Sequence, residues 1–197
     1  MKKIFILILF FTINLTNFNP AYSISPDVFI QSTVNRASQV LSENISKDEK
    51  ISKLKLIAKE TVDIKGVGFY SLGAARKNLN NSQKKTYSEL FENYFLKSFS
   101  SRLAEYTNPE IEVKDKKVLN GNYTIVTSIL VGTSERPEVN IDWRVYTKNP
   151  DNPLIRDLII EGLSLARTQK EEFASILNSN DNNIDVLFKT LREFSQN

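Results

Sequence analysis

The sequence contains no cysteine and no histidine, and these two absences exclude much of the usual catalytic chemistry. Without them the chain has no disulfide, no thiol nucleophile, no Ser–His triad and no ordinary structural zinc site. It also lacks a glycine-rich phosphate loop and a GxGxxG sequence. Catalysis would therefore depend on carboxylates, so we expect a protein that is not an enzyme and has no cofactor or metal.

The first 23 residues have the pattern of a secretory signal peptide. Lys2 and Lys3 precede a short apolar run over 4–15, and Ala21-Tyr22-Ser23 has the small-residue pattern of a cleavage site. The run is shorter than a typical membrane-spanning helix. The alternative to a cleaved signal peptide is an N-terminal membrane anchor that is not cleaved. The absence of cysteine excludes a lipoprotein. We therefore predict an exported protein with a signal peptide, 1–23, and a single domain, 24–197.

Little net charge would remain after export. The signal peptide contains two lysines and no acidic residue, so its removal lowers the formal net charge from +3 to +1. Such a chain has no strong positive field with which to bind nucleic acid. A mature domain of roughly 174 residues buries enough surface to fold without disulfides or metals.

Residues 139–177 contain a strand, a turn, a second strand and a helix, and the other predicted elements are arranged around them. The first strand, over 139–146, alternates an apolar face that includes Trp143 with a polar face. A turn with two prolines follows, and the second strand, 154–161, is predicted to pass through Glu161 and Gly162 directly into a helix. This second strand is apolar on both faces. It should be covered on both sides or line a cavity.

Helices are predicted on both sides of the strands. Ser25 is a candidate N-cap for the first of them, with Pro26 at the first helical position. Apolar spacing and turn residues give helices over 26–43, 47–60, 82–106, 166–177 and 183–195, and a bent glycine-containing segment over 62–79. The strongest is 82–106, in which six aromatic residues and two leucines recur at steps of three and four. That stripe either belongs to a core or forms the wall of an apolar pocket.

Two further strands precede residue 139. Segments 111–119 and 123–131 flank the hairpin signal Asn120-Gly121, and the second is again apolar on both faces. The order of helices, strands and helices predicts an α+β fold: a curved antiparallel sheet of about four strands, wrapped by N-terminal and C-terminal helices. Strands that are apolar on both faces are consistent with an enclosed apolar cavity.

Two blocks of residues resemble the MlaC (toluene-tolerance) family. The first is Glu161-Gly162-Leu163-Ser164-Leu165, with Asp157 before it and Thr168-Gln169-Lys170 and Phe173 after it. The second comprises Asp63, Leu72-Gly73, Leu90-Phe91, Tyr94, Ser101-Arg102-Leu103 and Tyr106. The blocks occur in the expected order, and the resemblance covers roughly 60–192. One departure is Leu154-Ile155-Arg156, where the family often has a tryptophan, so the shape of that pocket wall is not carried over.

The resemblance implies a periplasmic, phospholipid-binding protein that shuttles glycerophospholipids and helps to maintain outer-membrane lipid asymmetry. The implied partners are an inner-membrane ABC transporter complex with its MCE-domain protein and an outer-membrane lipoprotein–porin complex. The implied ligand is a phospholipid whose acyl chains lie between the sheet and the helices, with the headgroup outside. A monomer is the expected state of such a shuttle.

The candidate lipid-binding residues are apolar or aromatic and come from the glycine-containing segment, the long helix and the strands. They are Val67, Tyr70, Leu72, Phe91, Tyr94, Phe95, Ile129, Val131, Trp143, Val145, Leu158, Ile160 and Leu163. Pockets and cores share the same composition, so each residue either lines a pocket or belongs to the core.

Two alternatives differ in class from a lipid carrier. A carboxylate enzyme on a cone-shaped α+β fold would use Asp142, Asp157 or Glu161 as a base, with a raised carboxyl pKa in a cleft. A periplasmic adaptor that binds only proteins would have a filled core in place of a cavity.

Overall fold

The structure is a computed structural model that describes residues 23–134 and 136–196. The predicted signal peptide, apart from Ser23, lies outside the described residues. Among those described, no helix has the length and apolar character required to span a bilayer. The elements in chain order are α1 (Pro26–Ser42), α2 (Lys47–Thr61), α3 (Ile64–Ser71), the 3-10 helix η1 (Gly73–Lys77), α4 (Asn81–Leu103), β1 (Ile111–Asn120), β2 (Tyr123–Leu130), β3 (Val139–Tyr146), β4 (Leu154–Ile160), β5 (Leu163–Ser164), α5 (Leu165–Asn178) and α6 (Ile184–Gln196).

The α+β fold with a curved antiparallel sheet is confirmed, with one strand more than the four anticipated. The strands follow the sheet order β1-β2-β3-β4-β5, and each pairs antiparallel with the next. Val126, Trp143 and Leu158 are directly paired across β2, β3 and β4. This register places one row of apolar side chains across the middle of the sheet.

The extra strand corrects the prediction that β4 runs directly into a helix. Glu161 and Gly162 form a tight two-residue turn, with φ of 48° and 82°. Positive φ at both central positions matches the twist of a hairpin, and Gly162 adopts it without steric cost. The turn returns the chain so that Leu163 pairs with Ile160, and Ser164 then caps α5 by accepting a hydrogen bond from the Arg167 N–H.

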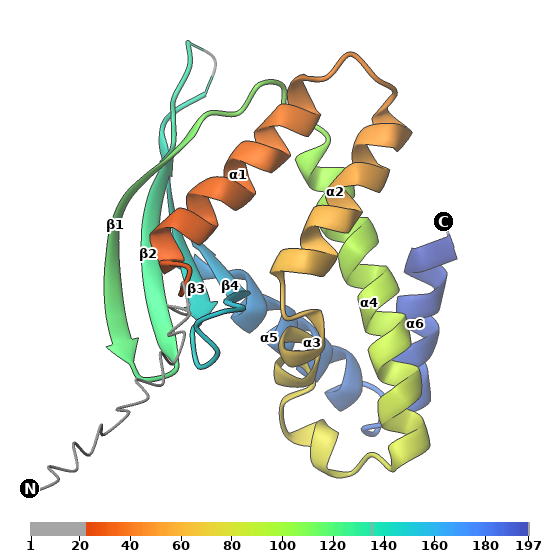
Figure 1. The fold of residues 1–197 in the computed structure, drawn as a ribbon. Coiled ribbons are helices and arrows are strands. Elements are labelled where there is room, and N and C mark those ends of the chain that lie inside the picture. The colour runs from red at the N-terminus through yellow and green to blue at the C-terminus, as the bar shows by residue number, and fades with distance from the viewer. Residues whose placement is uncertain (1–22, 135, 197) are drawn as a thin grey trace, which may run out of the picture.

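The helices gather on one side of the sheet, and α1 runs across β1 and β2 (Figure 1). The burial of β2 follows this arrangement. Its buried residues are Thr124, Val126, Ser128 and Leu130, and the intervening ones are half-buried. Although the sequence of β2 is apolar on both faces, only one of them meets the helices.

The long helix α4 supplies the largest ring cluster of the core. Phe91 is 2% exposed, and its ring centroid lies 5.7 Å from that of Tyr87 and 6.2 Å from that of Phe173 on α5. The Tyr87 hydroxyl donates a 2.9 Å hydrogen bond to the carbonyl oxygen of Gly68 on α3. These contacts join α3, α4 and α5, and Gly68 permits the close approach because it has no side chain.

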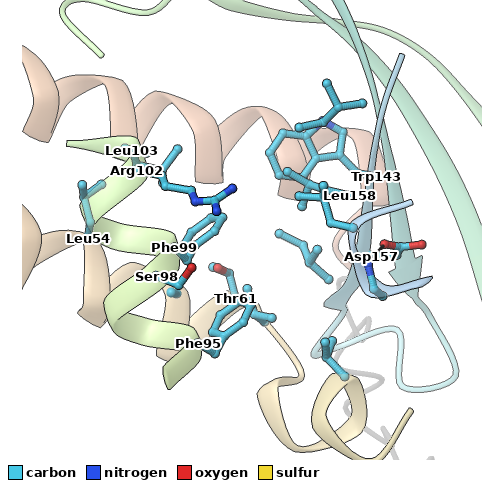
Figure 2. A pocket seen from close by; sticks show the side chains of 18 of the residues that line it. Leu54, Thr61, Phe95, Ser98, Phe99, Arg102, Leu103, Trp143, Asp157 and Leu158 are labelled. Carbon is cyan, nitrogen blue, oxygen red and sulfur yellow. Dashed lines mark hydrogen bonds between the residues drawn. The ribbon is translucent and has the colours of Figure 1, made fainter. Parts of the chain in front are cut away.

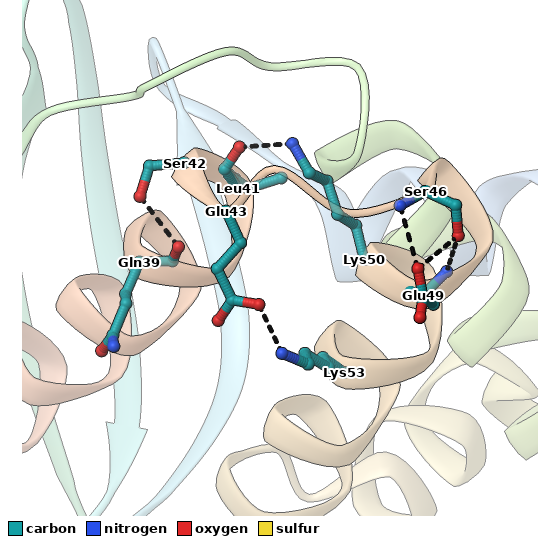
Figure 3. Close-up of polar contacts among 8 residues, drawn as sticks. All are labelled: Gln39, Leu41, Ser42, Glu43, Ser46, Glu49, Lys50 and Lys53. Carbon is teal, nitrogen blue, oxygen red and sulfur yellow. Dashed lines mark hydrogen bonds and ion pairs between the residues drawn. The ribbon is translucent and has the colours of Figure 1, made fainter.

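Local hydrogen bonds close the connection between α1 and α2 (Figure 3). The Ser46 hydroxyl accepts from the Glu49 N–H, and the Glu49 carboxylate accepts from the Ser46 N–H, which is a complete capping box. The Lys50 ammonium donates to the Leu41 carbonyl oxygen at 2.7 Å, where α1 ends. Ser25 occupies the predicted N-cap position of α1, but its hydroxyl donates to the Asp27 carboxylate and makes no bond to the helix backbone.

Gly68→Ala should destabilise the fold because the new methyl group meets a ring that is enclosed by other rings. An ideal Cβ at this position lies 2.7 Å from Phe91 Cδ1. Overpacking costs about 1–3 kcal/mol, against about 1 kcal/mol of helix propensity gained, so we expect a net loss of about 1 kcal/mol in the free energy of unfolding. Urea denaturation measures this change in the free energy of unfolding. Gly121→Ala is the matched control, since nothing lies within 4 Å of its Cβ; an equal effect of both substitutions would contradict the packing argument.

Asp27 should stabilise the protein in a pH-dependent way. Its hydrogen bond with Lys116 is the largest cause that lowers its pKa from 3.8 to about 2, with a further bond from Ser25. A lowered folded-state pKa stabilises the protein above the unfolded-state pKa, and this contribution is lost as pH falls through about 4 towards 2. The free energy of unfolding, measured by urea denaturation, should therefore differ less between wild type and Asp27→Asn below pH 4 than at neutral pH. A constant difference from pH 7 to pH 3 would refute this, and Asp151→Asn in the exposed β3–β4 turn is the control.

Candidate functional site

A cavity of about 530 Å³ lies between the helices and the inner face of the sheet. Every main layer of the fold contributes to its wall. The apolar lining comes from α1 (Val34, Ala37, Leu41), α2 (Leu54, Ile57, Ala58), α4 (Phe91, Phe95, Phe99, Leu103), β2 and β3 (Leu130, Ile141, Trp143), and β4 (Ile155, Leu158, Ile160). Figure 2 shows rings of α4 facing Trp143 and Leu158 of the sheet across this space.

The α4 wall follows from residues spaced four apart. Phe91, Phe95 and Phe99 lie on one face of the helix, and the Phe95 and Phe99 rings stack at 5.5 Å with an interplanar angle of 10°. Phe91 lines the cavity but is buried in the core, whereas Phe95 and Phe99 are only half-buried. The helix therefore changes from core to cavity wall along its own length.

The sheet wall is apolar because its polar atoms are already bonded. The Trp143 indole Nε1–H donates to the Ser128 hydroxyl at 2.8 Å, and that hydroxyl donates to the Ile141 carbonyl oxygen at 3.2 Å. On the opposite side, the Thr61 hydroxyl donates to the Ile57 carbonyl oxygen at 2.8 Å. Groups satisfied in this way carry no penalty for remaining out of water.

A short polar rim runs from α4 to α5. The Tyr94 hydroxyl donates to Gln169 Oε1 at 2.8 Å, and Gln169 Nε2 donates to the Glu172 carboxylate at 2.8 Å. Burial raises the pKa of Tyr94, and the Glu172 carboxylate raises it further, while the bond to Gln169 and the charge of Arg102 oppose the change. The phenol therefore remains neutral at physiological pH.

Arg156 lines both this cavity and a second one of about 460 Å³, to which Tyr70, Arg76 and Arg144 contribute. Its guanidinium donates from Nε to Asp63 at 2.7 Å and from Nη1 to the Tyr123 hydroxyl at 2.6 Å, and it lies 3.7 Å from the Tyr146 ring centroid. All of its charge is thus held by the protein itself. The side chain ties the beginning of α3 to the sheet.

The structure brings seven of the thirteen predicted residues to the cavity lining: Val67, Phe91, Tyr94, Phe95, Trp143, Leu158 and Ile160. The other six do not line it. Leu72 and Val145 are buried in the core, Tyr70 and Leu163 are 41% and 60% exposed, and Ile129 and Val131 are half-buried. On β2 the lining residue is Leu130, on the face opposite to Ile129.

The walls formed by α1 and α2 were not anticipated as lining. Residues such as Val34, Leu54 and Ile57 read as ordinary core positions of amphipathic helices. Phe99 was predictable in principle, because it continues the aromatic stripe of α4. Nothing in the sequence distinguished the α1 and α2 residues from core.

The three carboxylates of the enzyme alternative are not brought into one site. Asp157 is buried, and its carboxylate accepts bonds from the Ser164 hydroxyl at 2.6 Å and the Ala166 N–H at 3.0 Å, so it holds the start of α5. Asp142 accepts from the Thr127 hydroxyl at 2.7 Å, and Glu161 is exposed. In the described part of the chain, no group of three or more acidic side chains is placed to bind a metal ion.

Comparisons with known proteins indicate the family and the fold of this chain. The family model described as MlaC protein matches residues 31–193. A search of curated proteins found no match. Among solved structures, the chain is similar to the phospholipid-binding protein from Ralstonia solanacearum in complex with a phospholipid, with a TM-score of 0.73 and 18% identity over 88% of this chain and 98% of that one. That likeness shows a shared fold, and the family match covers most of the chain. The chain belongs to the MlaC family.

Proposed function

We propose that this protein carries a glycerophospholipid across the periplasm, with the acyl chains in the cavity and the headgroup at its mouth. The observation that carries the proposal is the apolar cavity of about 530 Å³, which is walled by Phe95 and Phe99 on one side and Trp143 on the other. Membership of the MlaC family supports it, as does the phospholipid bound to the similar Ralstonia protein.

The energetics of transfer explain why a carrier needs such a cavity. Each methylene moved from water to an apolar site is worth about 0.8 kcal/mol, so two chains of about 15 carbons amount to about 20–25 kcal/mol. This free-energy cost prevents a lipid alone from crossing water at a useful rate. A cavity with satisfied polar groups replaces the bilayer interior during transit.

The mouth of the cavity is marked by apolar side chains that are both lining and exposed. Tyr106, Leu165 and Phe194 contribute to the wall, and they are 39%, 40% and 41% exposed. Exposed apolar groups beside a cavity provide a continuous surface along which acyl chains slide between a partner and the interior. We therefore place the route of lipid exchange between α4, α6 and the start of α5.

We further propose that exchange occurs with the partners typical of this family. These are an inner-membrane ABC transporter complex with an MCE-domain protein and an outer-membrane lipoprotein–porin complex, so that the protein serves outer-membrane lipid asymmetry as a monomer. The signal peptide predicted over 1–23 would deliver it to the periplasm.

Neither alternative is favoured by the geometry. A protein-only adaptor would have a filled core, and a cavity of this size is costly unless a ligand occupies it. For an enzyme, Asp157 is the only one of the three proposed bases that lines the cavity, and both of its oxygens accept hydrogen bonds.

The mature protein should contain bound phospholipid when it is purified from the periplasm under mild conditions. Native mass spectrometry should show an added mass that is lost on denaturation, and lipid extraction should identify the species. If the protein is lipid-free and also takes up no labelled phospholipid from vesicles, the carrier proposal is wrong.

Ser98→Trp should reduce lipid uptake by filling the cavity from within. Ser98 lines the cavity on α4, and an indole there would occupy space needed by the acyl chains. We expect several-fold less phospholipid per protein in extraction assays, with the folded state retained by circular dichroism. Ser82→Trp, exposed at the start of the same helix, is the control and should bind as wild type does. Equal lipid content in both variants would show that this cavity is not the binding site.

A further inference from the structure

Arg102 is a cation of the cavity wall that forms no ion pair in the described part of the chain. Two arginines and no lysine are among the described residues that line the cavity, and Arg156 is fully engaged by Asp63 and Tyr123. Within residues 23–134 and 136–196, the Arg102 side chain makes no hydrogen bond or ion pair. Its charge therefore remains free for a ligand.

The position of Arg102 directs this charge to the cavity mouth. Tyr94, Ser98 and Arg102 follow one another at steps of four on α4, and all three line the cavity. Figure 2 shows the Arg102 side chain extending from α4 into the space that faces Trp143. The residue is also exposed, as is typical of an arginine whose stem covers an apolar wall while its guanidinium reaches water.

No ion pair joins Arg102 to either acidic residue of the same cavity, Asp157 or Glu172. Asp157 accepts bonds from Ser164 and Ala166, and Glu172 accepts one from Gln169. The influence of Arg102 still reaches the rim, since its charge opposes the burial that raises the pKa of Tyr94. An unpaired guanidinium beside an apolar cavity fits a ligand with apolar chains and one anionic group.

We propose that Arg102 binds the phosphate diester of the glycerophospholipid and so fixes the headgroup at the mouth. This inference rests on the proposed function. A guanidinium matches two phosphate oxygens with parallel N–H donors, which a lysine cannot do. Every glycerophospholipid carries this phosphate, whatever its headgroup alcohol. Arg102 therefore selects for phospholipids as a class against neutral diacylglycerols, and the polar headgroup substituent is left in water.

The test compares three short-chain lipids with identical acyl chains. Delipidated mature protein is titrated with dioctanoyl phosphatidylethanolamine, dioctanoyl phosphatidylglycerol and dioctanoylglycerol. Trp143 is the only tryptophan of the chain and lines the cavity, so its fluorescence reports occupancy. Charge-assisted hydrogen bonds are worth about 1.5–3 kcal/mol, so Arg102→Gln should weaken binding of both phospholipids by about tenfold or more and leave dioctanoylglycerol unchanged. The phospholipid affinity of Arg102→Lys should lie between that of wild type and that of Arg102→Gln.

Arg167→Gln is the matched control, because Arg167 is exposed on α5 and does not line the cavity. Unchanged phospholipid affinity in Arg102→Gln would overturn the role of Arg102 and leave the carrier function standing. An equal loss for dioctanoylglycerol would also overturn it, since it would show that the substitution damages the cavity. If wild type binds none of the three lipids, the proposed function itself fails.

Discussion

The packing of Phe91 is the contact on which the arrangement of the helices depends. Its ring is enclosed by rings from α4 itself and by Phe173 of α5, and Gly68 of α3 approaches it with no side chain between them. One buried ring therefore fixes three helices relative to one another. One and two turns further along α4, Phe95 and Phe99 also line the cavity but are only half-buried. The same periodic stripe thus forms core at one end and cavity wall at the other.

A cavity of this kind persists only if the polar groups around it are bonded elsewhere, because an unsatisfied buried group costs about 1–3 kcal/mol. The structure meets this condition with protein partners. Trp143 donates to Ser128, Arg156 is held by Asp63, and the Asp157 carboxylate accepts two bonds at the start of α5. The Trp143 contact joins β3 to β2, whereas the contacts of Arg156 and Asp157 connect α3 and α5 to the sheet. The intervening space is left to apolar surface.

This division of roles suits a carrier. Apolar burial is non-directional and roughly proportional to area, so in the proposed function the aromatic and aliphatic walls would accept acyl chains of different length without precise contacts. Selectivity then has to come from a polar group. Among the described residues, Arg102 is the lining cation that forms no ion pair, and its proposed place at the mouth would give recognition of the phosphate without burying a charge.

The sequence alone determined the α+β class, the antiparallel meander and the aromatic helix, because hydrophobic periodicity and turn residues are local signals. It also carried the family resemblance through Glu161 to Leu165. Only the tertiary structure decided which apolar residues line the cavity. Ile129 and Leu130 are equally apolar neighbours on opposite faces of β2. Leu130 lines the cavity because its face of the sheet is the one covered by helices. The turn at Gly162 was not predicted for a related reason. The positive φ at Glu161 accompanies the pairing of β5 with β4, and no local sequence pattern encodes that pairing.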